Sequence, residues 1–128
     1  PQLLFLYMIH SYKNLIVWQR AIELVVAVYE LTDQFPKEEI YGLSSQMRRA
    51  AVSIVSNIAE GRFRGTKKDF SQFLRISYAS GAELETQVEI GKRLPKTHQL
   101  NYVKVDEKLL EVMKMLNVMI RNLKSLAS

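Results

Sequence analysis

The fold of this chain follows from residues 41–68, which read YGLSSQMRRAAVSIVSNIAEGRFRGTKK. Apolar and small residues recur in this stretch at steps of three and four, which is the spacing of one face of an α-helix. They are Leu43, Met47, Ala50, Ile54, Ile58 and Gly61. Gly42 precedes the pattern and Gly65 follows it, as is typical of helix boundaries. The stretch therefore predicts a helix over residues 43–62.

The net charge of the chain arises in the same region. Residues 43–75 contain seven basic side chains and two acidic ones, whereas the remainder contains eleven of each. The seven are Arg48, Arg49, Arg62, Arg64, Lys67, Lys68 and Arg75. A formal charge of +5 and a pI near 9.5 favour acidic partners, nucleic acid first among them. The alternative is that this charge only keeps a small domain in solution.

Length and composition are those of an ordinary globular protein. The 128 residues are enough for one domain with a single core, and 48% of them are hydrophobic and 24% charged. The absence of cysteine excludes a disulfide framework, a thiolate zinc site and a thiol nucleophile. It also fits a reducing compartment, so we expect a cytoplasmic protein.

A first long helix is predicted over residues 14–35, with Asn14 as its N-cap and Pro36 just beyond its end. Two apolar stripes follow it at helical spacing and together span roughly 220° of its surface. The first stripe contains Trp18, Ile22, Val25 and Tyr29, and the second contains Val17, Leu24 and Leu31. We assign the first stripe to the core. We assign the second to an interface between subunits, together with a strip of the next helix formed by Val52, Val55 and Ala59.

Two more helices complete the pattern, over residues 66–94 and 104–126. Thr66 with Asp69 resembles a capping box at the start of the earlier one. Gly81 and Gly91 lie in its apolar stripe at a cost of about 1 kcal/mol each, so we expect close backbone packing there. Four helices with short connections predict an all-α fold, an antiparallel up-down-up-down four-helix bundle. Besides the first stripe, its core should contain Met47, Ile54, Ile58, Phe73, Leu74, Leu84, Val88, Leu109, Val112, Leu116 and Leu123.

The first twelve residues differ from the rest and form a separate N-terminal arm, so we place the bundle domain in residues 13–128. The apolar run from Leu3 to Ile9 is too short to span a bilayer, and no basic segment precedes it as in a signal peptide. We therefore expect no association with a membrane. Because Met8 looks like a more natural start, we hypothesise that residues 1–7 are an upstream extension.

Few residues suggest a reaction centre. None of the ten glutamates is followed three residues later by a histidine, which excludes the ferritin-like di-iron pattern. Residues 61–67 lack the glycine and lysine spacing of a phosphate-binding loop. Glu83, Glu85 and Glu89 are interpreted as a solvated face with a Glu89–Arg93 pair, and Asn57 as a hydrogen-bonding residue. We predict no metal, no cofactor and no enzymatic activity.

The basic turn between the second and third helices is the main candidate for a binding site. The N-terminus of a helix favours an anion, and Arg62, Arg64, Lys67 and Lys68 add positive charge around it. Phe63 offers a face on which a base could stack. The alternative is a solvated turn with Phe63 packed into the end of the bundle. Arg48 and Arg49 have a similar alternative, in which they hold an interface by pairing with carboxylates such as Glu60 or Glu85.

Several of these segments resemble a known family. The stretches YKNLIVWQRA (residues 12–21), QMRRAAVSI (46–54), NIAEG (57–61) and AELETQ (82–87) are similar to the four-helix bundle proteins encoded in 23S ribosomal RNA intervening sequences. The resemblance covers residues 12 to 126. It implies a ring-like homopentamer. The chain is also similar to the accessory protein of diversity-generating retroelements, a basic pentameric bundle, which implies RNA or a reverse transcriptase as partner.

Two functions remain open at this point. The first is a non-catalytic oligomer, associated with RNA, that binds nucleic acid through the basic residues given above. The second is a structural or protein-interaction scaffold without nucleic-acid binding. Composition does not separate them, because both need a stable bundle with a polar surface.

Overall fold

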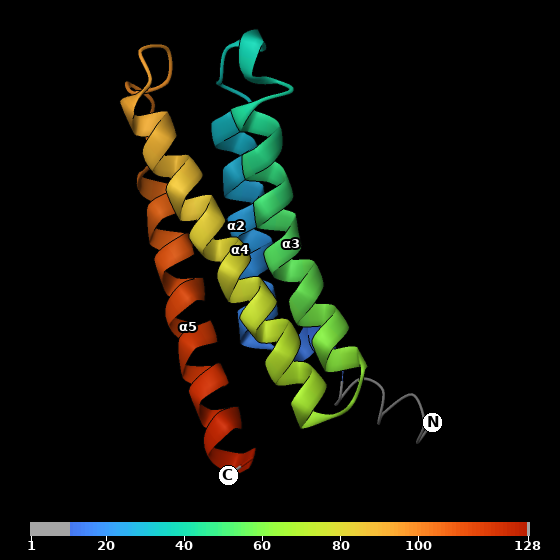
Figure 1. The fold of residues 1–128 in the computed structure, drawn as a ribbon. Helices are drawn as coiled ribbons and strands as arrows, with labels where there is room; N and C mark the ends of the chain where they lie inside the picture. Colours follow the sequence, from blue (N-terminus) through green and yellow to red (C-terminus); the bar gives the residue numbers. More distant parts are fainter. Residues whose placement is uncertain (1–10, 128) are drawn as a thin grey trace.

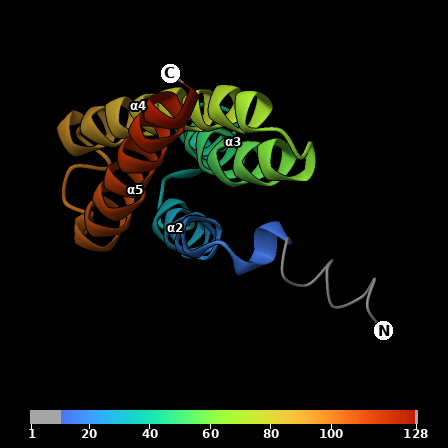
Figure 2. The same ribbon diagram turned by 90° about the horizontal axis from the view of Figure 1, so that it is seen from below.

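The structure, a computed structural model, describes residues 11–127, and helices account for most of them. The four long helices are α2 (Ile16–Thr32), α3 (Leu43–Phe63), α4 (Lys67–Arg93) and α5 (Val103–Ala127). Two short 3-10 helices precede α2 and α3, η1 (Tyr12–Asn14) and η2 (Lys37–Glu39). Successive long helices run in opposite directions (Figure 1), and each packs against two others, so that α2 and α4 both contact α3 and α5 (Figure 2). The predicted antiparallel up-down-up-down four-helix bundle is confirmed.

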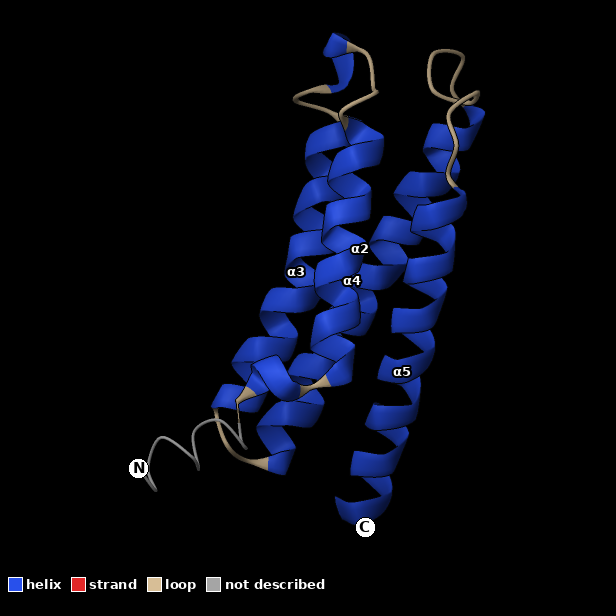
Figure 3. Ribbon diagram, turned by 180° about the vertical axis from the view of Figure 1, so that it is seen from behind, coloured by secondary structure: helices blue, strands red, loops and turns tan. Residues whose placement is uncertain are grey.

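The two ends of the bundle differ in what they carry. The α2–α3 and α4–α5 connections lie together at one end, which we call the loop end (Figures 1 and 3). The short α3–α4 connection, residues 64–66, lies at the other end beside the last turns of α5 and the start of α2. We call this the turn end. Most of the predicted N-terminal arm, residues 1–10, lies outside the described residues.

The N-cap predicted from the sequence is confirmed for α4 but not for α2. At α4 the predicted cap is confirmed, because the Thr66 side chain accepts a hydrogen bond from the Asp69 backbone amide at 3.1 Å. The prediction that Asn14 caps the first helix is wrong. Its backbone amide donates to the carbonyl of Ser11 at 3.1 Å, so Asn14 belongs to η1. Leu15 takes the cap position of α2 without a side-chain hydrogen bond.

The predicted register of the first helix is also wrong. Ile22 and Tyr29 are 37% and 40% exposed, whereas Val17, Leu24 and Leu31, predicted at a subunit interface, are at most 2% exposed. The register differs because the alanines of α2, which belong to neither predicted stripe, face the core. Ala21 and Ala27 are at most 2% exposed and let α3 and α5 approach α2, so the centre of the wide apolar arc shifts to the second stripe.

The predicted core of the other three helices is largely confirmed. The buried members, each at most 3% exposed, are Met47, Ile54, Ile58, Leu74, Leu84, Val88, Leu109, Val112 and Leu116. Phe73 and Leu123 are only half-buried. Val55, predicted at an interface, is 8% exposed and belongs to the core, while its predicted neighbour Val52 is 39% exposed.

Helices α3 and α4 pack closely along their length, as the small residues between them allow. The Ser77 hydroxyl donates to the carbonyl of Ile54 at 2.8 Å, and the hydroxyls of Ser53 and Ser80 are 2.8 Å apart. Asn57 donates to the carbonyl of Ser53 at 2.8 Å, which confirms it as a hydrogen-bonding residue. The glycines of α4 do lie in close contacts, but with side chains rather than with the backbone that was predicted. A Cβ added at Gly81 would meet the side chain of Met113, and one at Gly91 would lie 2.6 Å from the Tyr102 hydroxyl.

Candidate functional site

The structure divides the seven predicted basic residues between the two ends of the bundle. Arg62, Arg64, Lys67, Lys68 and Arg75 lie at or near the turn end. Arg48 and Arg49 lie in the first turns of α3, at the loop end. Thirteen residues of helix separate Arg49 from Arg62, or about 20 Å at 1.5 Å per residue. The seven therefore do not form one surface.

Arg48 is occupied by contacts that tie α3 to α2. Its Nε donates to the Thr32 hydroxyl at 2.8 Å, and its Nη2 donates to the Asp33 carboxylate at 2.8 Å. The guanidinium also lies over the ring of Tyr29, 4.3 Å from its centre. Within the chain Glu60 is out of reach of Arg48, because twelve residues of helix, about 18 Å, separate the two along α3. A pairing of Arg48 with such a carboxylate across a subunit interface stays a prediction. Arg48 is thus part of the fold rather than a free cation.

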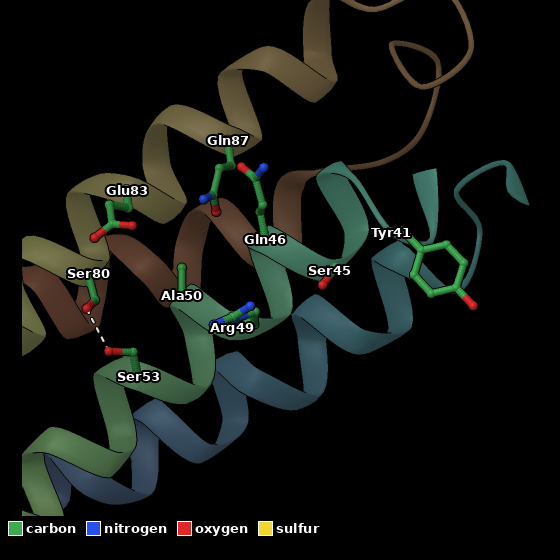
Figure 4. A pocket seen from close by; sticks show the side chains of 9 residues that line it. All are labelled: Tyr41, Ser45, Gln46, Arg49, Ala50, Ser53, Ser80, Glu83 and Gln87. Carbon is green, nitrogen blue, oxygen red and sulfur yellow. Dashed lines mark hydrogen bonds between the residues drawn. The ribbon is translucent and has the colours of Figure 1, made fainter. Parts of the chain in front are cut away.

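Arg49 lines an open groove of about 580 Å³ between α3 and α4 (Figure 4). The groove is lined by Tyr41, Ser45, Gln46, Arg49, Ala50, Ser53, Ser80, Glu83 and Gln87. Within the part of the chain that the structure describes, the buried Oε1 of Gln87 has no hydrogen-bond donor. The groove carries one cation, Arg49, and one carboxylate, Glu83, so it is not a concentrated anion site.

The turn end collects positive charge on three helices. Lys67, Lys68 and Arg75 are exposed on the first turns of α4. Arg62 is half-buried at the end of α3, 5.9 Å from the centre of the Phe70 ring. Gly65 completes the turn between the helices with φ of +86°, a left-handed conformation that favours glycine.

Arg64 differs from its neighbours because it is partly neutralised. Its Nη2 lies 3.2 Å from the carboxylate of Glu60, one helical turn earlier. Its guanidinium also lies over the Phe73 ring, 4.8 Å from the centre. Glu60, suggested as a partner of Arg48 or Arg49, is thus the partner of Arg64.

The C-terminal part of α5 adds residues that sequence reasoning missed. A groove of about 360 Å³ is lined by Arg62, Gly65, Thr66, Lys67, Phe70 and Leu123. A second groove of about 460 Å³ is lined by Lys67, Lys68, Ser71, Arg75, Leu123 and Lys124. The two grooves adjoin each other, because they share Lys67 and Leu123, and we call them together the basal trough. The position of Lys124 could have been predicted, since an up-down topology places the end of the fourth helix beside the α3–α4 turn.

The ion pairs of the described residues leave the turn end uncompensated. Of nine pairs, only that between Arg64 and Glu60 involves the α3–α4 turn. The two pairs of Arg20 lie near the start of α2, and the other six lie along the bundle or at the loop end. One of these six is the predicted pair of Glu89 and Arg93, at 3.4 Å. Within residues 11–127 no ion pair involves the five remaining cations of the trough, which are Arg62, Lys67, Lys68, Arg75 and Lys124.

The loop end shows the opposite arrangement, in which charges neutralise each other. The ammonium group of Lys96 lies 2.6 Å from the Glu38 carboxylate. This hydrogen bond lowers the pKa of Glu38 below its ordinary 4.5 and raises that of Lys96 above 10.5. The ammonium group of Lys92 similarly lies 2.7 Å from Asp106, and that bond raises the pKa of Lys92. Unpaired positive charge is therefore concentrated at the turn end, whereas these charges of the loop end are paired.

Phe63 completes the turn end. It is the last residue of α3, and 78% of its surface is exposed. The alternative in which it packs into the end of the bundle is therefore wrong. Among the described residues, no group of three histidine or acidic side chains could hold a metal ion, and no helix has the length and hydropathy needed to cross a membrane.

Comparison with solved structures finds this fold in a protein of unknown function of the S23 ribosomal protein family from Bacteroides thetaiotaomicron. The two chains are 23% identical and align with a TM-score of 0.70, over 82% of this chain and 98% of that one. At this identity the likeness shows the fold alone. No curated protein matches the chain. The model of the 23S rRNA-intervening sequence protein family matches residues 13–118, and this chain therefore belongs to that family.

Proposed function

We propose that this protein is a non-catalytic, cytoplasmic scaffold that binds RNA through the turn end of its bundle. The observation that carries the proposal is the basal trough, whose five cations come from three helices and make no ion pair within the described residues. Lysine and arginine side chains in such a place attract phosphate groups, which supply most of the affinity of basic proteins for nucleic acid. Contacts of this kind read the backbone, so the binding has little sequence specificity.

Assembly would multiply this charge. We propose that the protein is a homo-oligomer, a pentamer as the family resemblance implies. Exposed apolar side chains on α2 and α3 support an interface, although not the one expected from the sequence: they are Ile22, Val26, Tyr29 and Val52, each 37–51% exposed. A ring would repeat the trough in every subunit and strengthen weak sites through effective concentration. Light scattering at micromolar concentration tests this, and a persistent mass of 14.8 kDa would refute it.

A matched pair of variants tests RNA binding. Lys67, Lys68 and Arg75 are changed to alanine in the turn-end variant, whereas the control carries the same change at three other exposed cations, Lys37, Arg49 and Lys114. Both variants lose three charges, and none of the six side chains takes part in an ion pair among the described residues. Binding of a structured RNA is measured by fluorescence anisotropy from about 50 to about 200 mM salt.

The salt dependence separates the outcomes. Each lost phosphate contact lowers the slope of log K against log salt by about 0.7–0.9, so the turn-end variant should lose a slope of about 2 while the control keeps the wild-type slope. Equal slopes for the two variants would show that the turn end is not the site. If the wild-type protein has no affinity at the lowest salt, RNA binding itself is refuted.

The groove between α3 and α4 favours a second function, that of a protein-interaction scaffold. Arg49 and Glu83 offer charges of both signs there, and the buried Oε1 of Gln87 lacks a donor. A protein partner such as a reverse transcriptase would pair its own charged groups with Arg49 and Glu83. In this case an Arg49→Glu substitution would abolish capture of the purified partner without changing the affinity for RNA.

A further inference from the structure

We infer that the turn end takes unpaired RNA in preference to duplex, with one base stacked on Phe63. The inference rests on the proposed function and narrows it to a class of substrate. It is carried by two observations that a purely electrostatic site would not need, namely the apolar lining of the basal trough and the exposure of an aromatic ring at the α3–α4 turn.

The apolar lining lies between the cations. Phe70, which is 8% exposed, lines the trough next to Arg62 and Lys67, and the half-buried Leu123 lines both of its grooves. A duplex hides the faces of its bases in the stack and would present ribose, phosphate and the polar edges of its bases to these side chains. An unpaired strand has free base faces that bury apolar surface while its phosphates reach the lysines.

Phe63 provides the stacking surface. With 78% of its area exposed, it contributes little to the core, and it directly follows Arg62 in the chain. The turn around it is open, because a Cβ added at Gly65 would meet no atom within 4 Å. A base in a single strand can lie flat against such a ring whatever its identity, and the neighbouring cations neutralise the adjoining phosphates.

The dimensions of the trough suit a short strand. Lys67 and Arg75 are eight residues apart on α4, or about 12 Å along the helix axis. At about 3.4 Å for each stacked nucleotide, this length accommodates three or four nucleotides. A duplex-binding surface would instead have to follow the backbone across two successive grooves of an A-form helix.

The test compares one RNA in two states. A labelled, unstructured RNA of about twelve nucleotides is titrated as a single strand and as a duplex with its complement. The proteins are wild type, Phe63→Ala, Phe63→Leu, Phe63→Trp and the control Tyr41→Ala. Tyr41 is a suitable control because it is 96% exposed and lies at the loop end. A polyglutamate peptide of similar charge serves as a non-nucleic-acid ligand.

Wild type should bind the single strand more tightly than the duplex. Phe63→Ala and Phe63→Leu should lower the affinity for the single strand about 5- to 150-fold, which corresponds to 1–3 kcal/mol for a stacked base. Phe63→Trp should retain it, because the aromatic face remains. None of these changes should alter the affinity for the duplex, and Tyr41→Ala should alter neither.

Four results would overturn the inference. Duplex binding as tight as single-strand binding, or a Phe63→Ala variant that behaves like Tyr41→Ala, would overturn it while leaving RNA binding intact. Tighter binding of polyglutamate than of the single strand would point to an acidic protein partner. A wild-type protein that binds neither RNA would refute the proposed function together with the inference.

Discussion

Replacing Gly61 by alanine tests how closely α3 and α4 are held together near the turn end. A Cβ at this position would lie 2.6 Å from the Cβ of Phe73 and 3.4 Å from the Cα of Phe70. Both atoms are fixed to the backbone of α4, so only a separation of the two helices relieves the contact. Gly81 is the matched control, because a Cβ there would meet the Sδ and Cε of Met113, a flexible and half-buried side chain that can turn away.

The expected free energies differ in sign. Alanine is favoured over glycine in a helix by about 1 kcal/mol, whereas overpacking a close contact costs about 1–3 kcal/mol. Because both contacted atoms are anchored to the backbone of α4, the cost at Gly61 should lie at the upper end of that range. Gly61→Ala should therefore lower the free energy of unfolding by about 2 kcal/mol, and its melting temperature by about 4 °C per kcal/mol. Gly81→Ala should leave the free energy unchanged or raise it by up to about 1 kcal/mol.

Urea unfolding followed by circular dichroism at 222 nm measures both variants. The protein concentration must be the same throughout, because any subunit association shifts the apparent stability by mass action. The reasoning fails if Gly61→Ala is as stable as the wild type, or if Gly81→Ala is the more damaging of the two. Either result would mean that the packing of α3 on α4 yields more easily than the contacts at Gly61 indicate.

Three further predictions concern the core, the α2–α3 contact and a buried hydroxyl. Ile54→Ala should cost about 2–5 kcal/mol in urea unfolding, since Ile54 is fully buried, and a near-neutral result would contradict its central position. Arg48→Ala should cost about 1–3 kcal/mol through its charged hydrogen bonds and Arg49→Ala almost nothing, so equal losses would count against the Arg48 contacts. Burial raises the pKa of the Tyr102 hydroxyl above 10.0, so the unfolded chain loses this proton at a lower pH than the folded protein. The free energy of unfolding therefore falls as the pH rises above about 10. Tyr102→Phe should remove that part of the alkaline loss, and parallel stability curves for the two proteins above pH 10 would show that the hydroxyl ionises freely.

Local patterns in the sequence were sufficient for the helices and most of the core. Spacing at steps of three and four located α3, α4 and α5 to within one or two residues, and Thr66 marked the start of α4. The same spacing could not predict which side of the apolar arc of α2 is buried most deeply. Both stripes of that helix are apolar, and the choice between them depends on how α3 and α5 approach Ala21 and Ala27.

The candidate site was predicted only as far as its residues are neighbours in the chain. The basic residues of the α3–α4 turn are contiguous and were found, although their freedom from ion pairs was not visible. Leu123 and Lys124 join them only through the direction of α5. Arg48 was misassigned because its partner, Asp33, precedes it by fifteen residues across the α2–α3 connection, a contact that no helical spacing encodes.

The short α3–α4 connection affects the order in which the helices pair during folding. Only residues 64–66 separate these helices, so their pairing closes a short loop, whereas the pairing of α2 with α5 joins nearly the two ends of the chain. Closing long loops costs more entropy, so the α3–α4 hairpin should form early and the seam between α2 and α5 late. Since α5 supplies Leu123 and Lys124 and packs on α4 as well as on α2, the basal trough exists only once α5 has packed against α4. A ligand that bridges Lys67 and Lys124 binds only where α5 is packed on α4. It therefore stabilises the complete bundle relative to every state in which α5 has separated from the other helices.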